Sequence, residues 1–192
     1  MSFKQQGVTF LELLITISIT LILVTIAVPS FSDLIKRSRI SGVTGELMAA
    51  LNLARSEAIR RGQSVSVCKS SDGASCGGTN WDSGWIVFIN EDNDSPAAVD
   101  NGETILRVRQ DLPQGITVRP NSNFANYLTF SRTGLANSLG TFAICVDSDE
   151  STAKAITVIR TRASIATDGD GNGIPEKVDD DELADIGSCE NP

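Results

Sequence analysis

The sequence contains no histidine among its 192 residues. Catalysis by a histidine base, a Ser-His-Asp triad or a Cys-His pair is therefore excluded, because each of these mechanisms needs an imidazole. A lysine or a carboxylate could still act as an acid or a base, but no motif in the chain indicates such a role. We therefore expect a protein that is not an enzyme.

Basic residues are few. Sixteen Lys and Arg residues stand against 24 Asp and Glu residues, and the net charge is −8. This balance argues against binding nucleic acid over the whole surface, since the phosphate backbone is attracted to positive charge. Local basic patches remain compatible with the composition. The four cysteines form no Cys-x-x-Cys pair, which, with histidine absent, disfavours a zinc site.

A long apolar stretch near the N-terminus dominates the chain. From Phe10 to Val28 the only charged residue is Glu12. About 20 residues rising ~1.5 Å each span a hydrocarbon core of ~30 Å, so residues 8–29 are predicted to cross a bilayer as one helix. A secretory signal peptide is the alternative, because Lys4 precedes the stretch. The stretch is longer than a usual signal core, however, and lacks a small-x-small cleavage site at its end.

The acid inside this stretch is informative, because a carboxylate at membrane depth costs ~2.5–3.5 kcal/mol on insertion scales and needs a partner. The segment Gly7-Val8-Thr9-Phe10-Leu11-Glu12-Leu13-Leu14, followed by Pro29, resembles the class III signal of type IV pilins and type II secretion pseudopilins. The resemblance implies that a prepilin peptidase cleaves after Gly7 and N-methylates Val8, a position at which the family usually has Phe. It also implies that Glu12 pairs with the N-terminal amine of a neighbouring subunit during assembly. An ordinary membrane anchor with a snorkelling Glu12 is the other interpretation.

The helical period continues beyond Pro29. Gly62 follows Arg60 and Arg61, which is typical of a helix end. We expect one helix over about residues 8–61, kinked but not ended by Pro29. Apolar residues recur in its second half at three- and four-residue steps, which predicts a stripe that packs on a sheet. The stripe comprises Ile40, Val43, Leu47, Leu51, Ala54 and Ala58.

From Gln63 onward the apolar period is two, which predicts strands. Residues 84–89 form a continuous apolar run, typical of a central strand that is covered on both faces. Further short strands are expected at 103–109, 115–119, 126–131, 141–147 and 154–160. The chain is therefore predicted to be an α+β protein, with a long helix followed by about seven antiparallel strands.

Motifs in this second part resemble the GspH/FimT group of minor pilins and pseudopilins over about residues 45–160. They are Ala54-Arg55-Ser56-Glu57-Ala58-Ile59-Arg60-Arg61, Val65-x-Val67-Cys68, Trp81-x-x-Gly84-Trp85-Ile86-Val87-Phe88 and Phe130-x-x-x-Gly134. Trp85 and Phe88 are expected to pack in the core rather than to bind a ligand. The resemblance implies a leader over residues 1–7, a membrane or pilus-core helix over 8–29, and a globular domain over 30–192 that ends in an acidic tail over 168–192.

Four cysteines behind a membrane-targeting N-terminus indicate an oxidising compartment and two disulfide bonds. Three pairings are possible. We favour Cys68–Cys76, which closes a short loop rich in Gly and Ser, and Cys145–Cys189, which tethers the tail.

An acid-rich segment matches a calcium-binding loop. The residues from Asp168 to Asp179 fit the pattern D-x-D-x-N-G-x5-acid, with Asp where an EF-hand has Glu. Several hard oxygens can then converge on one Ca²⁺, and Gly173 allows the sharp turn between them. The predicted ligands are the side chains of Asp168, Asp170, Asn172 and Asp179, the carbonyl of Ile174, and Glu176 through a water molecule. A solvated acidic loop without metal is the alternative, and this is what we expect of residues 90–94, which lack the glycine.

Two arginines form a candidate DNA-binding motif. Some FimT-type minor pilins take up DNA through a Gly-Arg-x-Arg motif at the end of a late strand, and Arg160-Thr161-Arg162 resembles it, with Ile159 in place of the glycine. Two such arginines could donate to phosphates on one side of a strand, with Arg132 and Arg119 expected nearby. The alternative is an exposed strand end balanced by the acids that follow, which would repel DNA.

These observations indicate a minor subunit of a type IV pilus, at the tip or in the initiation complex. A type II secretion pseudopilin is the close alternative, and a DNA-uptake subunit that binds through Arg160 and Arg162 is the distant one. The expected partners are other pilins or pseudopilins, the prepilin peptidase and the inner membrane. The precursor is expected to span the inner membrane once, and the mature chain to enter a fibre at the cell surface or in the periplasm.

Overall fold

The structure is a computed structural model that describes residues 7, 9–121, 124–169, 171–172, 174–179 and 182–190. Residues 26, 28–30, 177–179 and 182–184 are described by their backbone alone. The chain divides into two units, Met1–Ser38 and Arg39–Pro192. The helix α1 (Phe10–Arg61) is continuous and contributes to both units. The sequence predicted that Pro29 does not end the helix, and the structure confirms this.

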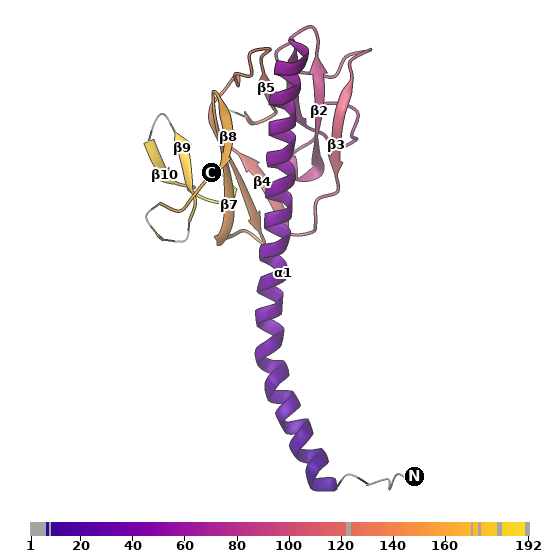
Figure 1. Ribbon diagram of the computed structural model, residues 1–192, viewed down its shortest axis with the longest axis vertical. Helices are drawn as coiled ribbons and strands as arrows, with labels where there is room; N and C mark the ends of the chain where they lie inside the picture. The colour runs from indigo at the N-terminus through magenta and orange to yellow at the C-terminus, as the bar shows by residue number, and fades with distance from the viewer. Residues whose placement is uncertain are drawn as a thin grey trace, which may run out of the picture. The chain divides into compact units, whose positions relative to one another are not determined.

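In the part of the chain that the structure describes, ten strands and one short 3-10 helix follow α1. Figure 1 labels most of the strands. The first group is β1 (Ser64–Lys69), η1 (Trp81–Ser83), β2 (Gly84–Asn90), β3 (Ile105–Gln110), β4 (Ile116–Pro120) and β5 (Tyr127–Phe130). The second group is β6 (Gly140–Val146), β7 (Asp149–Ile159), β8 (Arg162–Ile165), β9 (Glu176–Asp179) and β10 (Glu182–Asp185). They form two antiparallel four-stranded sheets, in the orders β3-β2-β1-β5 and β4-β6-β7-β8, and one hairpin, β10-β9.

The second half of α1 covers the inner faces of both sheets. Its apolar stripe is buried, and Leu47, Leu51 and Ala54 have no exposed surface. All six residues of the predicted stripe lie in this core, together with residues from β1, β2, β4, β6 and β7. Two polar contacts fasten the helix at its sides. Arg109 on β3 pairs with Glu46 at 2.5 Å, and Lys154 on β7 donates to the hydroxyl of Ser41 at 3.0 Å.

Strand β2 is buried along its whole length, as expected of a central strand covered on both faces. Trp85 lies in the core under α1, whereas Phe88 lies in a second core on the opposite face of the sheet. Both side chains are fully buried, so the expectation that they pack is confirmed. Gly84 begins the strand with a φ of +123°, and a Cβ there would overlap the carbonyl oxygen of Arg109 on β3. The glycine of the Trp-x-x-Gly-Trp motif is therefore needed for the close pairing of β2 with β3.

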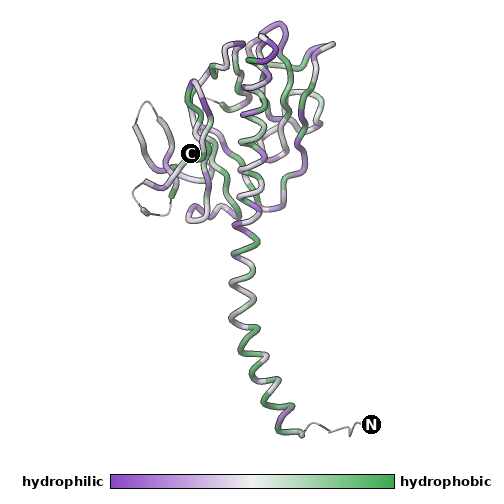
Figure 2. Tube along the Cα trace, in the orientation of Figure 1, coloured by the Kyte–Doolittle hydropathy of each residue, from purple (hydrophilic) through white to green (hydrophobic). Residues whose placement is uncertain are grey.

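The predicted α+β architecture is confirmed, but the sequence underestimated the number of strands. Each strand predicted between residues 65 and 160 has a counterpart displaced by a few residues, the largest difference being the earlier start of β7. Strand β8 and the hairpin β9–β10 were missed. The hairpin lies within residues 168–192, which were expected to be an acidic tail. Figure 2 shows repeated hydrophobic stretches along the first half of α1, separated by paler ones. They belong to the apolar run from Phe10 by which this segment was found in the sequence.

Candidate functional site

The first turn of α1 is closed by Thr9. The amide of Glu12 donates to the Thr9 hydroxyl at 3.2 Å, and the amide of Leu13 donates to the Thr9 carbonyl at 3.1 Å. Thr9 is thus the N-cap residue and Glu12 stands three positions later, which is the spacing of a capping box. Thr9 was not among the predicted site residues, although the Thr-x-x-Glu pattern is present in the sequence. The carboxylate of Glu12 lies in the first helical turn, where the helix dipole favours negative charge.

The first half of α1 is apolar and uncovered within the chain. Every side chain from residue 10 to 25 is exposed, including Phe10 at 77% and Leu21 at 61%. The hydroxyls on this surface bond to carbonyls of their own helix, as Thr16 does to Leu13 and Ser18 to Leu14, each at 2.8 Å. Their donors therefore need no water, which suits an apolar environment. Such a helix requires cover from lipid or from other helices.

Within the residues that the structure describes, no helical segment combines the length and the hydropathy of a membrane-crossing helix. The crossing expected for residues 8–29 stays a prediction. Val8 lies outside the described residues, and the side chain of Pro29 is not described. Gly7 is exposed and lies just before the helix.

The C-terminal segment is fastened to the second sheet at several points. Cys145 on β6 is joined to Cys189, and Cys68 is joined to Cys76, which are the pairings that the sequence favoured. Ile186 is buried against Ala143 and Ala155. The described part of the tail, which the sequence predicted to be acidic and tethered by Cys145–Cys189, therefore covers the outer face of the second sheet.

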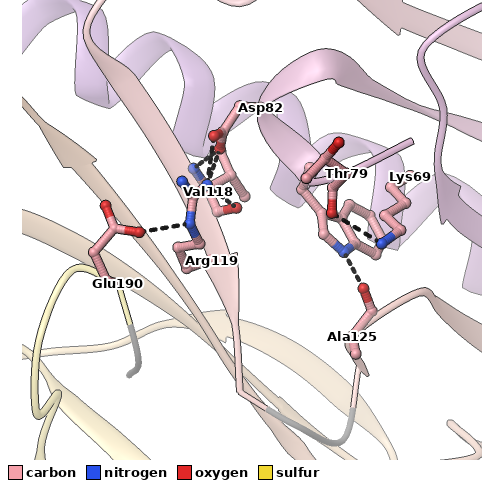
Figure 3. A network of polar contacts seen from close by, with 8 residues as sticks. Lys69, Thr79, Asp82, Val118, Arg119, Ala125 and Glu190 are labelled. Atoms are coloured by element: carbon pink, nitrogen blue, oxygen red, sulfur yellow. Dashed lines mark hydrogen bonds and ion pairs between the residues drawn. The ribbon is translucent and has the colours of Figure 1, made fainter. Parts of the chain in front are cut away.

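A polar network holds the end of the tail to β4 (Figure 3). Arg119 pairs with Asp82 of η1 at 2.5 Å and with Glu190 at 3.1 Å. Asp82 also accepts a bond from the amide of Val118 at 2.6 Å. Burial opposes the charge of Arg119, but the bonds to Asp82 and Glu190 outweigh it, so its pKa lies above the ordinary value. Arg119 is thus bound to two carboxylates.

The predicted calcium loop is described only in part. Asp170 and Gly173 lie outside the described residues, and the side chain of Asp179 is not described. Asp168 accepts bonds from the amides of Gly171 at 2.7 Å and Asn172 at 3.1 Å. The side chains of two other predicted ligands also form hydrogen bonds. Asn172 accepts from the Ile174 amide at 2.7 Å and donates to Asp185 at 2.7 Å, and Glu176 accepts from the Gly169 amide. Calcium binding by this loop remains a prediction.

A different group of acids converges in the described part of the chain. One carboxylate oxygen from each of Asp92, Asp94 and Asp100 lies within 4.8 Å of the others, close enough to hold one metal ion. Asp94 is oriented by the buried Asn90, whose amide nitrogen donates to it at 2.9 Å. Residues 90–94 were predicted to form a solvated loop because they lack the glycine, and no motif in the sequence places Asp100 beside them.

Calcium is expected to raise the melting temperature of the chain through the loop at 168–179. Loops of this kind in extracellular proteins bind with Kd values of ~10⁻⁴ to 10⁻³ M. With a Kd of ~10⁻³ M, about 10 mM Ca²⁺ stabilises the fold by about 1.4 kcal/mol, or about 3 to 5 °C. Differential scanning calorimetry with and without Ca²⁺ measures this shift. We expect Asp170→Ala to remove the shift and Asp100→Asn to retain it; the opposite result would assign the ion to Asp92, Asp94 and Asp100.

Arg160 and Arg162 flank the tight turn between β7 and β8. Ile159 pairs with Arg162 across the hairpin, and both arginines are exposed. Arg132 is also exposed, in the turn that follows β5. The structure thus places the arginines of the candidate DNA motif on the surface. DNA binding by them stays a prediction. A gel shift at low salt tests it, with Arg160→Ala/Arg162→Ala as the variant.

One acid near the end of α1 is held by two arginines. Glu57 bonds to Arg60 at 2.5 Å and to Arg61 at 2.6 Å, and these bonds lower the pKa of Glu57 from 4.5 to about 2. A pKa that is lower in the folded state than in the unfolded state stabilises the fold at pH values above the unfolded-state pKa. This stabilisation is lost as the pH falls towards 2. Because the side chain of Arg60 is 61% exposed, solvent weakens the effect.

We therefore expect Glu57→Gln to be less stable than the parent at pH 6, and the two proteins to converge as pH falls from about 4.5 to about 2. Urea unfolding of the chain in detergent at several pH values measures this. Glu150→Gln is the control, because Glu150 has no ion pair in the described part of the chain. A constant difference between parent and Glu57→Gln across this range would contradict the assignment.

Comparison with solved structures shows the same fold in a known pilin. The crystal structure of the type IV minor pilin FimU from Pseudomonas aeruginosa strain PAO1 is 22% identical, with a TM-score of 0.53, and the match covers 69% of this chain and 91% of FimU. A second crystal form of FimU has a TM-score of 0.48 and 22% identity, covering 66% of this chain and 92% of FimU. None of the curated proteins compared with the sequence gives a significant match.

Two protein-family models match the sequence. The prokaryotic N-terminal methylation motif matches residues 2–28. The family described as "Type II transport protein GspH" matches residues 43–162, which is more than half of the chain. With its long N-terminal helix packed on antiparallel sheets, the chain belongs to the GspH family of minor pilins and pseudopilins.

Proposed function

We propose that this chain is a minor subunit of a type IV pilus, placed at the tip or in the initiation complex. The precursor is anchored in the inner membrane by residues 8–29, and the prepilin peptidase cuts it after Gly7 and methylates Val8. The first half of α1 then leaves the lipid and packs with the equivalent helices of other subunits. Pilins are structural subunits and need no catalytic site. The sequence, which contains no histidine, is compatible with such a role.

The observation that supports assembly most directly is the character of the first half of α1. Its described side chains are exposed and apolar, its hydroxyls bond within the helix, and its single charge from residue 10 to 25 is Glu12 at the start. A bundle of such helices buries the apolar surface of each. One carboxylate in that bundle needs an opposing charge, and the free amine that cleavage creates on a neighbouring subunit supplies it.

The choice of a pilus over a secretion pseudopilus rests on a weaker observation. FimU, whose fold this chain shares, is a type IV minor pilin, whereas the family description names type II transport. Shearing of surface fibres from the native host separates these alternatives. If our proposal is correct, the chain is recovered with the sheared pili, and its deletion reduces piliation but leaves protein secretion unchanged. Loss of secretion with normal piliation would assign the chain to a pseudopilus.

Cleavage by the prepilin peptidase is expected to depend on Gly7 because the enzyme must recognise this residue, and not because the fold requires a glycine there. A Cβ added at Gly7 meets no atom of the chain within 4 Å, so Gly7→Val should fold as the parent does. The peptidase, in contrast, must fit this residue beside the bond that it cuts. We expect mass spectrometry to show Val8 as the methylated first residue in the parent, and an intact N-terminal segment in Gly7→Val. Cleavage of the variant at the parent's rate would contradict processing at this bond.

A further inference from the structure

Positive charge is concentrated at one end of the globular unit. Six of the eleven arginines, Arg55, Arg60, Arg61, Arg132, Arg160 and Arg162, lie in the segments 55–61, 131–136 and 160–162. We call this group the arginine cluster. These three segments contain a single acid, Glu57, which is bound to Arg60 and Arg61. Such a concentration is unusual in a chain whose net charge is −8.

Hydrogen bonds bring the three segments together. Arg55 on α1 donates to the carbonyl of Gly134 at 3.2 Å, and the amide of Ala136 donates to the carbonyl of Arg160 at 2.8 Å. The segment that carries Arg132 thus lies between the end of α1 and the β7–β8 turn. Arg132, Arg160 and Arg162 have no side-chain partner among the residues that the structure describes.

Apolar side chains are exposed within the same surface. Ile59 is 49% exposed and Leu135 is 42% exposed. Ile59 lies against Gly134, since a Cβ on this glycine would come within 2.6 Å of its terminal carbon. A cleft of about 400 Å³ lies beside Arg132, and Gly62, Asn93 and the acid Glu91 are among the other residues that line it. The surface therefore combines arginines, exposed aliphatic groups and a hollow.

This combination favours a protein partner over a nucleic acid. Arginine is enriched in protein interfaces and lysine is depleted, and the three segments contain no lysine. They also contain no aromatic residue on which a base could stack. The partner must be acidic to match the charge. This chain shows that a pilin-type subunit can present such a surface, because its own sequence from Asp168 onward has nine acids and one lysine.

We propose that the arginine cluster, with Ile59 and Leu135, docks an acid-rich surface of a neighbouring pilin-type subunit. The proposal rests on the function proposed above, because it requires that the chain enters a fibre. It adds a contact between globular units to the packing of the N-terminal helices. The arginines neutralise the partner's carboxylates, and the two aliphatic side chains are removed from water.

Site-specific photo-cross-linking in the native host tests this docking. A benzophenone-bearing amino acid replaces Leu135 in the full chain, and a second strain carries it at Leu14, an exposed position in the first half of α1. We expect an adduct from Leu135 with a protein that carries an N-terminal methylation motif, mapped by mass spectrometry to a segment rich in Asp and Glu. Arg132→Glu/Arg160→Glu should reduce this adduct at least fivefold, whereas Arg107→Glu on β3 should not.

The double variant Arg132→Gln/Arg160→Gln removes the two charges without reversing them, and serves as a control for misfolding caused by the charge reversal. It should also reduce the yield of the adduct. An adduct with nucleic acid, or one that the charge reversals leave unchanged, would overturn the docking proposal. An adduct from Leu14 alone would overturn the docking but leave the pilus assignment standing. Absence of pilin-type adducts from both positions would contradict the proposed function and the docking surface together.

Discussion

Glu12→Ala is expected to reduce recovery of the chain in sheared fibres at least tenfold, while its fold and its amount in the membrane stay unchanged. The helix should survive the change, because its first turn is closed by the Thr9 hydroxyl and the amide of residue 12, not by the carboxylate. The lost attraction to the helix dipole is about 0.3–1 kcal/mol, and the high helix propensity of alanine offsets part of it.

The larger effect comes from assembly. A subunit with alanine at this position leaves a neighbour's amine unpaired in an apolar bundle, and an uncompensated charge at such depth costs about 2.5–3.5 kcal/mol. Since about 1.4 kcal/mol corresponds to a factor of ten, a tenfold loss is the lower bound. Quantitative immunoblots of the fibre and membrane fractions measure it.

Thr9→Ala is the matched control, because it removes the cap of the same helical turn and keeps the carboxylate. Loss of an N-cap costs about 1 kcal/mol of helix stability but leaves the charge pair possible. Recovery of Thr9→Ala in fibres should stay near the parent's. If Glu12→Ala enters fibres as readily as the parent, or if both variants fail equally, the carboxylate has no specific role in assembly.

The helix could be predicted from sequence because its signals are local and strong. The apolar run from Phe10, the stripe from Ile40 to Ala58 and the stop at Gly62 each depend on neighbours within one or two turns. The buried strand over residues 84–90 was found for the same reason, since a continuous run of apolar residues needs cover on both faces. The small number of cysteines also made the two disulfides a choice among three pairings.

The C-terminal region could not be predicted because its order depends on distant residues. Strands β9 and β10 are short and rich in acids, which local propensity disfavours in a strand. What places this region is the bond from Cys189 to β6, the burial of Ile186, and the pair between Glu190 and Arg119. The approach of Asp100 to Asp92 and Asp94 is also set by the fold of a loop, not by a motif.

Removal of the Cys145–Cys189 disulfide by Cys145→Ala/Cys189→Ala is expected to lower the free energy of unfolding by about 4 kcal/mol. The bond joins residues 44 apart in sequence. Closing a loop of this length restricts the unfolded chain by about 4 kcal/mol at 25 °C in the loop-entropy account. For a chain of this size the melting temperature should fall by roughly 8 to 16 °C. Urea unfolding in detergent measures the change.

Cys68→Ala/Cys76→Ala is the matched control, because its cysteines are only 8 residues apart and the same account gives about 2.5 kcal/mol. The two variants should also differ in where proteases cut. Without Cys145–Cys189, the described contacts at the end of the chain, such as the burial of Ile186 and the ion pair of Glu190 with Arg119, are all noncovalent, so cleavage after residue 165 should precede global unfolding. Equal losses of stability, with the C-terminal segment protected in both variants, would mean that noncovalent contacts are sufficient to hold this segment on the sheet.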